Sequence, residues 1–446
     1  MQLKSFRVRK FRNIVDSGEV KASESVTCLV GKNEAGKSGA LEALYLLNPA
    51  YKVKPDLEKQ YPRWLLAKDR RSGDLSEVEF ISAEFALDSD EIAELEEALG
   101  SKVFNYDSFK VTRTYSGNTI WHLGTDEAAI AAHLRGQLSK DVQKIVGEAS
   151  TLKALGETIN GIDVAGHEDV DGAEIKAAKG LVTKHNLLKA TVSDLVHGVI
   201  GDKLPTFFRF TGYNTLPGRI DLREVAAADE EPGNSAMQTA RALISLAGTT
   251  AKQLSADDYE QRRGEMEAVS IDLTNQVFDY WKQNPDLEVI IDVDKEEIPQ
   301  HNGTRVAARF LEIRLRDRRT GYSNNFSQRS SGFQWFFSFL AAFSEFENKE
   351  STVVLLDEPA LALHGRAQAD FLRFINERLA AASPVIYTTH SPFMVEMGHL
   401  ERVRIVEDRG PPEGSVISVT DRPIRATHDR PNGATCAPSK RVSNGV

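Results

Sequence analysis

Eight residues near the N-terminus, GKNEAGKS from Gly31 to Ser38, have the composition and spacing of a phosphate-binding loop. They fit the pattern G-x-x-x-x-G-K-[ST] between a strand-like stretch, VTCLV, and a helix-like stretch, SGALEALYLL. In such a loop the glycines let backbone N–H groups surround a β-phosphate, Lys37 reaches the β- and γ-phosphates, and the Ser38 hydroxyl binds Mg²⁺. The alternative is a glycine-rich turn that opens a helix. We predict a phosphate site made of Gly31, Lys32, Asn33, Glu34, Ala35, Gly36, Lys37, Ser38 and Gly39.

Two carboxylates follow a second apolar stretch, TVVLLDEP at residues 352 to 359. This stretch predicts a buried strand that ends at Asp357 and Glu358, and α/β sheets bind ligands at this end of their strands. There Asp357 would hold the water shell of Mg²⁺, and Glu358 would be the catalytic residue that orients or deprotonates the attacking water. Two acidic residues after a strand more often form a solvated loop, but the phosphate loop in the same chain favours the functional interpretation.

A histidine and a serine-rich helix start are further residues that could contact phosphate. His390 ends the next apolar strand, VIYTTH, so we expect it at the same sheet edge as the carboxylates, where it could contact the γ-phosphate. Ser330 and Gly332, in SQRSSGFQW, begin an apolar helix whose hydroxyl, free N–H groups and positive end favour an anion. The alternatives are a structural histidine and an ordinary serine N-cap.

The composition is that of an ordinary globular chain of two or three packing units. Its 446 residues are 41% hydrophobic and 27% charged, with a formal net charge of −10. That charge argues against non-specific coating of nucleic acid but leaves room for a local basic groove. Two cysteines, Cys28 and Cys436, provide neither a disulfide framework nor a zinc cluster. No membrane-length apolar run or secretory leader is visible, so we expect a cytoplasmic protein without a membrane partner.

The order of strand-like and helix-like segments predicts an α/β fold of mixed sheets and helices with a helical insertion. We expect an N-terminal lobe over residues 1–124 and a C-terminal lobe over residues 286–420. Between them residues 125–285 are mostly helical, interrupted by an extended segment at 204–224. The C-terminal lobe should contain a parallel strand, helix, strand unit. The polar tail, 421–446, is expected to be poorly ordered.

The motifs GKNEAGKS, SQRSSG, LLDEP and YTTHSP, in this order and after the opening FRVRKFRN, resemble the ABC-type ATPase heads of the RecF and SMC superfamily. Within it, LEALYLLNP, LPTFFRFTGYNTLPGRIDL and RSSGFQWFFSF resemble the ATPase region of the OLD (overcoming lysogenization defect) family of ATP-dependent nucleases. The resemblance extends over about residues 1 to 420 and implies an ABC-type ATPase that binds ATP and Mg²⁺. It also implies that Ser330 and Gly332 reach the ATP of a second subunit, which makes a nucleotide-gated homodimer or higher oligomer. In that assembly the helical insertion, residues 125–285, would contribute to dimerisation, and His390 would be a switch histidine.

The chain departs from the OLD pattern because nothing after His390 offers the carboxylates of a Toprim nuclease domain. Asp292 and Asp294 form a D-x-D, but it precedes the signature stretch, and we interpret it as a solvated strand end. We therefore expect no DNA cleavage by this chain alone. Either the nuclease is a separate Toprim subunit, or the gene is truncated or frameshifted, in which case an intact Toprim frame should lie directly downstream. The resemblance also implies a metal-contacting glutamine, for which Gln60 is a weak candidate.

The resemblance implies a role in DNA processing, in phage defence or repair. A non-hydrolysing scaffold that binds ATP to assemble a partner complex is the alternative, and the large insertion disfavours the ATPase subunit of a transporter. Two basic stretches, Arg7–Lys10 and Arg314–Arg319, are candidates for DNA contact. Alternating charges on strands more often form a solvated face.

Overall fold

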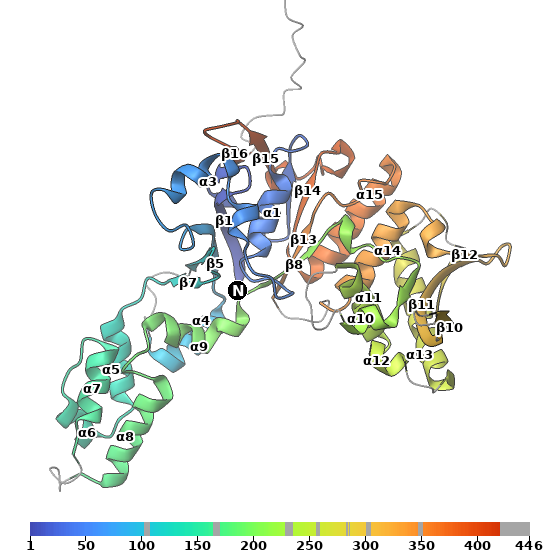
Figure 1. The fold of residues 1–446 in the computed structure, drawn as a ribbon. Coiled ribbons are helices and arrows are strands. Elements are labelled where there is room, and N and C mark those ends of the chain that lie inside the picture. Colours follow the sequence, from blue (N-terminus) through green and yellow to red (C-terminus); the bar gives the residue numbers. More distant parts are fainter. Residues whose placement is uncertain are drawn as a thin grey trace, which may run out of the picture.

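Three sheets and the helices around them form the part of the chain described by the computed structural model (Figure 1). That part comprises residues 1–101, 108–163, 170–227, 235–255, 259–281, 284, 286–299, 305–346 and 351–419. The tail predicted at 421–446, with Cys436, lies outside the described residues. The predicted α/β fold class is confirmed. No helix within these ranges is both long and apolar enough to span a bilayer.

The N-terminal sheet is antiparallel, and its strands alternate between a buried and an exposed face. In its first strand Phe6 and Val8 are buried, whereas Arg7 and Arg9 lie on the opposite face. The sheet lies beside the phosphate-loop helix, whose apolar side chains share a core with Phe6. Its strands are β1 (Gln2–Phe11), β2 (Ile14–Asp16), β3 (Val20–Lys21), β5 (Glu79–Ala86), β6 (Ser108–Thr114) and β7 (Thr119–His122).

The central sheet is parallel except for its last strand, and it brings together segments from the whole chain. The predicted strand, helix, strand unit is present: β13 and β14 pair in parallel, and helix α15 (Gly365–Phe374) lies between them in the chain. Every residue of β13 and β14 is buried, as expected of parallel strands with both faces covered. In spatial order the strands are β16 (Ser415–Val419), β15 (Val403–Asp408), β4 (Val26–Val30), β14 (Val385–Thr389), β13 (Thr352–Leu356) and β8 (Thr206–Phe210).

The two faces of the central sheet belong to two different hydrophobic cores. Val353 and Leu355 of β13 pack in the core that includes helix α1 (Lys37–Tyr45) and the N-terminal sheet. Val354 and Leu356 point the other way, into a core rich in aromatic side chains from helix α14 (Ser331–Phe343). The phosphate loop and the serine-rich signature are therefore placed on opposite sides of one sheet.

The helices between residues 125 and 285 form two groups, because strand β8 enters the central sheet between them. The first group, with α4, projects beside the N-terminal sheet, and the second covers the other side of the central sheet (Figure 1). The first consists of α4 (Ser89–Leu99), α5 (Glu127–Gly136), α6 (Lys140–Val146), α7 (Leu152–Asn160), α8 (Gly172–His185) and α9 (Val192–Ile200). The second consists of α10 (Leu222–Ala227), α11 (Ser235–Leu246), α12 (Ala251–Leu254) and α13 (Tyr259–Tyr280).

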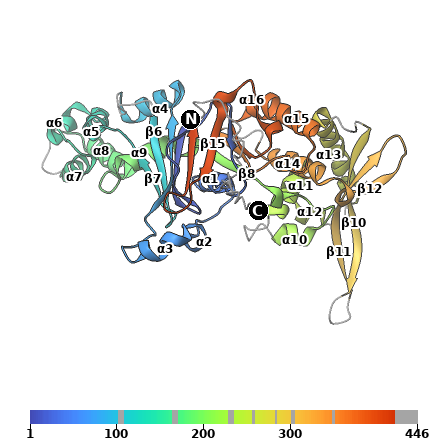
Figure 2. The same ribbon diagram turned by 90° about the horizontal axis from the view of Figure 1, so that it is seen from above.

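A long hairpin of β10 (Leu287–Pro299) and β11 (Arg305–Asp317) projects from the second group (Figure 2). Asp292 and Asp294 are exposed on it, and Asp294 lies 3.7 Å from the Arg219 guanidinium. This is the arrangement of a solvated strand. The short strands β9 (Arg219–Asp221) and β12 (Ser323–Asn325) pair with β11 to complete the third sheet.

The aromatic core around α14 should be the most sensitive point of the fold. Phe339 is fully buried, its ring centroid lies 5.4 Å from that of Phe210, and it packs against Phe371 of α15. We expect Phe339→Ala to lower the free energy of unfolding by about 3–5 kcal/mol, because it opens a cavity that the neighbouring rings cannot fill. The exposed Tyr322→Ala serves as the control and should change it by about 0.5 kcal/mol or less. Urea denaturation measures both, and similar losses in the two variants would contradict this assignment of the core.

Candidate nucleotide site

The ends of three neighbouring strands converge at one edge of the central sheet. β4, β14 and β13 are adjacent and parallel, so their C-terminal ends lie side by side. The phosphate loop follows β4, His390 follows β14, and Asp357 and Glu358 follow β13. The sheet thus places every catalytic and metal-binding residue predicted from the sequence at one position in space.

The phosphate loop is held in a shape that depends on its glycines. Gly36 has φ of 102°, a conformation that side chains rarely adopt. A Cβ on Gly31 would lie 2.3 Å from the carbonyl oxygen of Val406, in β15, and one on Gly36 would lie 2.7 Å from the Ser415 hydroxyl, in β16. The loop is therefore packed directly against the hairpin of β15 and β16, and neither glycine leaves space for a larger residue.

Lys37 is buried at the base of this loop. Its ammonium donates hydrogen bonds to the carbonyl oxygens of Gly31, at 2.9 Å, and Lys32, at 2.8 Å. The same ammonium lies 3.3 Å from Oε1 of Glu358. Lys32, Asn33 and Glu34 are exposed.

Asp357 has three hydrogen-bond donors from three different elements. The Ser38 hydroxyl donates to Oδ1 at 2.7 Å, and the Thr388 hydroxyl donates to the same oxygen at 3.0 Å. The guanidinium of Arg209, on β8, donates to Oδ2 at 2.8 Å. The carboxylate is therefore fixed beside Ser38, as a shared Mg²⁺ site requires.

Glu358 lies between Lys37 and His390. Its Oε2 is 3.2 Å from Nδ1 of His390, while its Oε1 contacts Lys37. Glu358 has φ of 47°, an uncommon conformation for a residue with a side chain, and its N–H donates to the Thr388 hydroxyl at 2.8 Å. Strained backbone of this kind is maintained only where neighbouring groups fix it, which is common in active sites.

A cavity of about 630 Å³ opens beside these residues and is large enough for a nucleotide. Four of its lining side chains are cationic, Arg12, Lys37, Lys59 and Arg63, and two are acidic, Glu34 and Glu358. The excess of cationic over acidic side chains favours a ligand with several phosphate groups. The remaining lining residues are Asn13, Gly36, Ser38, Gly39, Tyr61 and Trp64.

The residues at the cavity fit a magnesium ion that is bound together with phosphate. The Ser38 hydroxyl and the Asp357 carboxylate are hard oxygen ligands in mutual contact. Within the described residues no cluster of three His, Cys, Asp or Glu side chains could hold a metal by itself. Mg²⁺ commonly takes one or two protein ligands and completes its shell with phosphate oxygens and water, which is the arrangement these two residues permit.

Ser330 and Gly332 do not line this cavity, although the sequence grouped them with it. The Ser330 hydroxyl accepts the N–H of Phe333 at 3.4 Å and caps α14, so the N-cap interpretation describes its contact within the chain. A Cβ on Gly332 would lie 2.1 Å from a Leu363 methyl group, in the loop that follows Glu358. The signature therefore lies next to the acidic loop and remains exposed at Ser330.

Gln60, the weak candidate for a metal-contacting glutamine, does not line the cavity, and sequence reasoning missed Arg209. Both ends of the Gln60 side-chain amide are engaged away from the cavity: it donates to Glu42 at 2.9 Å and accepts from the N–H of Asp56 at 2.8 Å. Arg209 pairs with the carboxylate of Asp357 at 2.8 Å. The only available signal was the strand-like stretch TFFRF, which does not reveal that β8 pairs with β13.

Two buried hydroxyl and thiol groups near the site have raised pKa values. Burial raises the pKa of the Cys28 thiol, in β4, to about 12, against a smaller lowering effect of its hydrogen bond to Tyr387. Burial also raises the pKa of Tyr61, and its hydrogen bond to the Asp69 carboxylate adds to the effect. Both groups are therefore neutral at physiological pH, and Cys28 is an unreactive core thiol.

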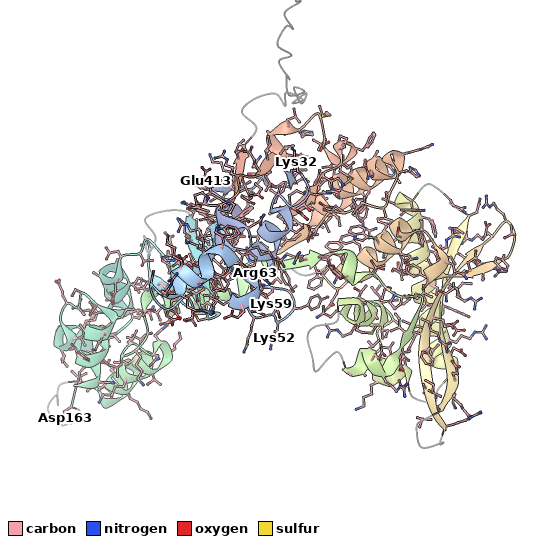
Figure 3. The ribbon with its side chains drawn as sticks, turned by 45° about the horizontal axis from the view of Figure 1, so that its top comes forward. Lys32, Lys52, Lys59, Arg63, Asp163 and Glu413 are labelled. Atoms are coloured by element: carbon pink, nitrogen blue, oxygen red, sulfur yellow. The ribbon has the colours of Figure 1, made fainter. Side chains whose placement is uncertain are left out.

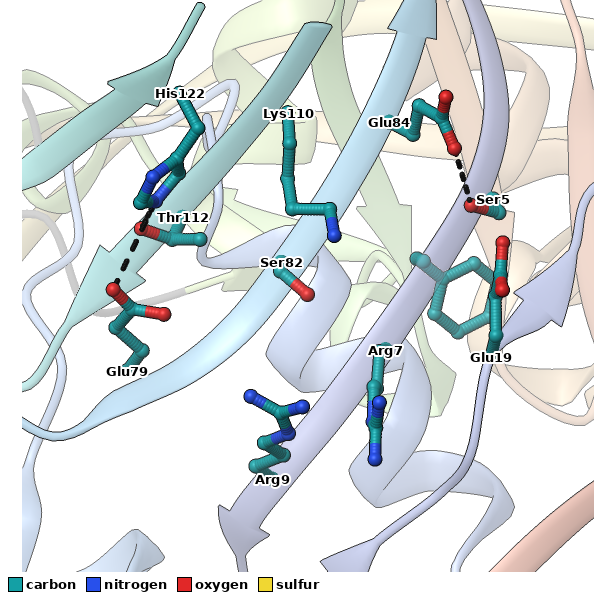
Figure 4. Close-up of a pocket in the computed structure, with 11 residues that line it drawn as sticks. Ser5, Arg7, Arg9, Glu19, Glu79, Ser82, Glu84, Lys110, Thr112 and His122 are labelled. Atoms are coloured by element: carbon teal, nitrogen blue, oxygen red, sulfur yellow. Dashed lines mark hydrogen bonds and ion pairs between the residues drawn. The ribbon is translucent and has the colours of Figure 1, made fainter.

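A second cavity, of about 530 Å³, lies on the exposed face of the N-terminal sheet (Figure 4). Its basic side chains, Arg7, Arg9 and Lys110, are balanced by Glu19, Glu79 and Glu84. No residue of the phosphate loop or of the acidic strand lines it. Because its charges are balanced and the phosphate loop does not line it, this second cavity does not favour a triphosphate.

The two basic stretches are neutralised by acidic neighbours. Arg7 and Arg9 both pair with Asp16, at 2.5 and 3.7 Å, and Lys10 pairs with Asp69 at 2.8 Å. On the projecting hairpin the arginines of Arg314–Arg319 pair with Glu288, Glu312, Asp286 and Asp317. These contacts are those of solvated faces, and they do not favour DNA binding at either stretch.

Comparison with known proteins gives two family matches. Residues 1–157 match a family described as an AAA ATPase domain, and residues 241–396 match one described as an AAA domain, putative AbiEii toxin, Type IV TA system. The first region contains the phosphate loop, and the second contains Ser330, Asp357, Glu358 and His390. Neither description is that of the OLD nucleases, so that closer assignment stays a prediction. No curated protein matches the sequence.

Solved structures similar to this chain include heads of SMC proteins. The SMC head bound to the C-terminal winged-helix domain of ScpA has a TM-score of 0.41 at 12% identity, over 94% of this chain and 97% of that one. The SMC head domain from Thermotoga maritima gives 0.37 at 12%, over 95% and 100%. The Smc head with an extended coiled coil, bound to a ScpA domain from Pyrococcus furiosus, gives 0.39 at 14%, over 93% and 95%. At these scores the likeness is limited to the general fold.

Two loop glycines make a matched test of the site geometry. We expect Gly31→Ala to weaken ATP binding and to lower the free energy of unfolding by about 1–3 kcal/mol, because the new methyl group meets the Val406 carbonyl. Gly73→Ala, in a loop that does not line the cavity, should change neither, since a Cβ there would meet nothing within 4 Å. Calorimetric titration with ATP and urea denaturation measure both. Equal behaviour of the two variants would contradict the packing of the loop on β15.

Proposed function

We propose that this chain is an ATPase that binds ATP with Mg²⁺, hydrolyses it, and works as a nucleotide-gated homodimer. The observation that supports it best is the set of contacts at one sheet edge: Ser38 with Asp357 at 2.7 Å, and Glu358 with Lys37 at 3.3 Å and with His390 at 3.2 Å. Lys37, Ser38 and Glu358 also line the cavity. The two AAA ATPase family matches support the same activity.

The proposed mechanism assigns one task to each residue of the site. Lys37 and the loop N–H groups hold the β- and γ-phosphates, and Ser38 with Asp357 holds the metal. When bound, Mg²⁺ neutralises charge that develops between the β- and γ-phosphates. Glu358 accepts a proton from the attacking water or orients it, and His390 steadies Glu358 and contacts the γ-phosphate side. Arg209 keeps the Asp357 carboxylate in position from the opposite side.

The exposed signature supports a composite site made by two copies of the chain. Ser330 lies at the start of α14 with its helix dipole behind it, and it does not line the cavity of its own chain. The loops around it present apolar side chains to solvent: Leu361 is 60% exposed and Phe393 is 63% exposed. Such side chains next to an anion-binding helix start suit a second copy that docks when its nucleotide is bound.

The proposed role is control of DNA processing in phage defence or repair, with a separate Toprim nuclease as the partner. It rests on the resemblance to the RecF, SMC and OLD group. The family description that names a toxin of a Type IV toxin–antitoxin system agrees with a defence setting. The alternative is a scaffold that binds ATP to assemble such a nuclease and does not turn over. The paired state of Glu358 with Lys37 and His390 favours a hydrolase, because a scaffold does not need a carboxylate positioned there.

Glu358→Gln distinguishes the hydrolase from the scaffold. We expect it to reduce the ATPase rate by at least about 100-fold, because the amide cannot take a proton from water, while ATP binding and ATP-dependent dimers persist. The exposed Glu377→Gln is the control and should retain the wild-type rate. Phosphate release, with and without double-stranded DNA, and light scattering measure the two properties. A wild-type chain that dimerises with ATP but never hydrolyses it would support the scaffold instead.

Mixing two inactive variants tests the composite site. Lys37→Ala lacks the phosphate contact, and Ser330→Arg blocks the signature, so each alone should be inactive. An equal mixture should recover about a quarter of the wild-type rate, because half of the dimers are mixed and each of those has one intact site of two.

The matched control mixes Lys37→Ala with Glu358→Gln, whose lesions both belong to the half-site of one chain. That mixture should remain inactive. Recovery in the control, or no recovery in the test mixture despite dimer formation, would show that Ser330 does not act across the dimer.

A further inference from the structure

The nucleotide cavity has a second wall opposite the phosphate loop. Helix α2 (Leu57–Gln60), Tyr61 and the start of helix α3 (Arg63–Arg70) contribute Lys59, Tyr61, Arg63 and Trp64 to the lining. Figure 3 shows Lys59 and Arg63 near one another on this segment. Because Lys37 and Ser38 occupy the phosphate end of the cavity, the rest of a bound nucleotide must lie toward this wall or the solvent.

Polar contacts fix the wall at a set distance from the phosphate loop. The Asp69 carboxylate of α3 accepts the Tyr61 hydroxyl at 2.6 Å and the Lys10 ammonium, from β1, at 2.8 Å. The Gln60 amide donates to Glu42 on α1, the helix that begins in the phosphate loop. This explains the position of Gln60: it joins the wall to α1. Because these contacts exist before a ligand binds, binding does not incur the entropy cost of ordering the wall.

Trp64 is the wall residue whose exposure the fold does not explain. The indole is 41% exposed, whereas the other three tryptophans of the chain, Trp121, Trp281 and Trp335, are at most 9% exposed. None of the residues of α3 is buried, so Trp64 contributes little to a core. A large aromatic face in an otherwise polar, positively charged cavity is suited to stacking on a flat ring that is attached to phosphates.

We propose that Trp64 stacks on the base of the nucleotide and that the α2–α3 wall makes the site one for purine nucleoside triphosphates. This inference rests on the nucleotide site proposed above. Arg12 and Lys59 also line the cavity, where their positive charges favour the phosphates of a bound nucleotide. Stacking uses the π-face, which adenine and guanine share, so ATP and GTP are both accepted. Pyrimidines bind less well because their single ring covers less of the indole.

The first test follows the fluorescence of Trp64 itself. Acrylamide quenches exposed indoles, and the other three tryptophans are buried, so the quenching reports on Trp64. The non-hydrolysable analogues AMPPNP and GMPPNP should protect it, whereas inorganic tripolyphosphate, which has no base, should bind without protecting it. Trp64→Phe removes the signal and identifies its source.

The second test measures affinity by calorimetry. Trp64→Ala should weaken AMPPNP and GMPPNP by about 5- to 150-fold, which corresponds to 1–3 kcal/mol of stacking at 1.4 kcal/mol per tenfold. Tripolyphosphate should bind this variant as it binds the wild type. Trp64→Phe keeps an aromatic face and should remain within about threefold of wild type, while Trp64→Leu, which keeps bulk without the π-face, should resemble the alanine variant.

The outcomes separate this inference from the proposed function. If the wild type binds neither AMPPNP nor tripolyphosphate, the nucleotide site itself is wrong and this inference falls with it. If AMPPNP binds but Trp64 stays open to acrylamide and Trp64→Ala keeps full affinity, the stacking is overturned while the ATPase proposal stands. A loss of tripolyphosphate binding in Trp64→Ala would likewise overturn it, because Trp64 would then act through the shape of the phosphate loop.

Discussion

The arrangement of the site depends on one carboxylate that links two strand ends of the central sheet to the phosphate loop. Glu358 follows β13 and contacts both Lys37, after β4, and His390, after β14, at 3.3 and 3.2 Å. These contacts exist only if the three strands are neighbours in the right register, since a shift of one residue would turn the side chains to the opposite face. The hydrophobic core that includes the antiparallel sheet covers one face of these strands, and the aromatic core around α14 covers the other.

A second constraint fixes the directions of the Asp357 and Glu358 side chains. A single hydroxyl, that of Thr388, donates to Asp357 and accepts the N–H of Glu358, so it sets the direction of both carboxylates. The unusual backbone of Glu358 costs of the order of 1–3 kcal/mol, and these contacts together offset it. The two acidic side chains therefore point to different sides: Asp357 to Ser38 and Arg209, and Glu358 to Lys37 and His390.

Candidate site residues could be predicted from the sequence where a single short stretch of chain determines their position. The phosphate loop, the acidic strand end and His390 each show in a short stretch, because spacing within a strand or loop determines their position. Arg209 could not be predicted, since its contact with Asp357 joins residues 148 positions apart and depends on β8 pairing with β13. The same pairing divides the helices of residues 125–285 into two groups, which helical periodicity alone cannot reveal. Gln60 does not line the cavity, because its amide bonds Glu42 and Asp56, and residue type alone does not tell which polar neighbours an amide contacts.

The support of the phosphate loop by the last hairpin has a consequence for how the protein is made. Val406 and Ser415 close the back of a loop that lies far upstream of them in the chain. Until β15 and β16 have been synthesised, the phosphate loop lacks these contacts and is not held in its native shape. The loop therefore reaches its native shape only after β15 and β16 have been synthesised, and we expect nucleotide binding to begin no earlier.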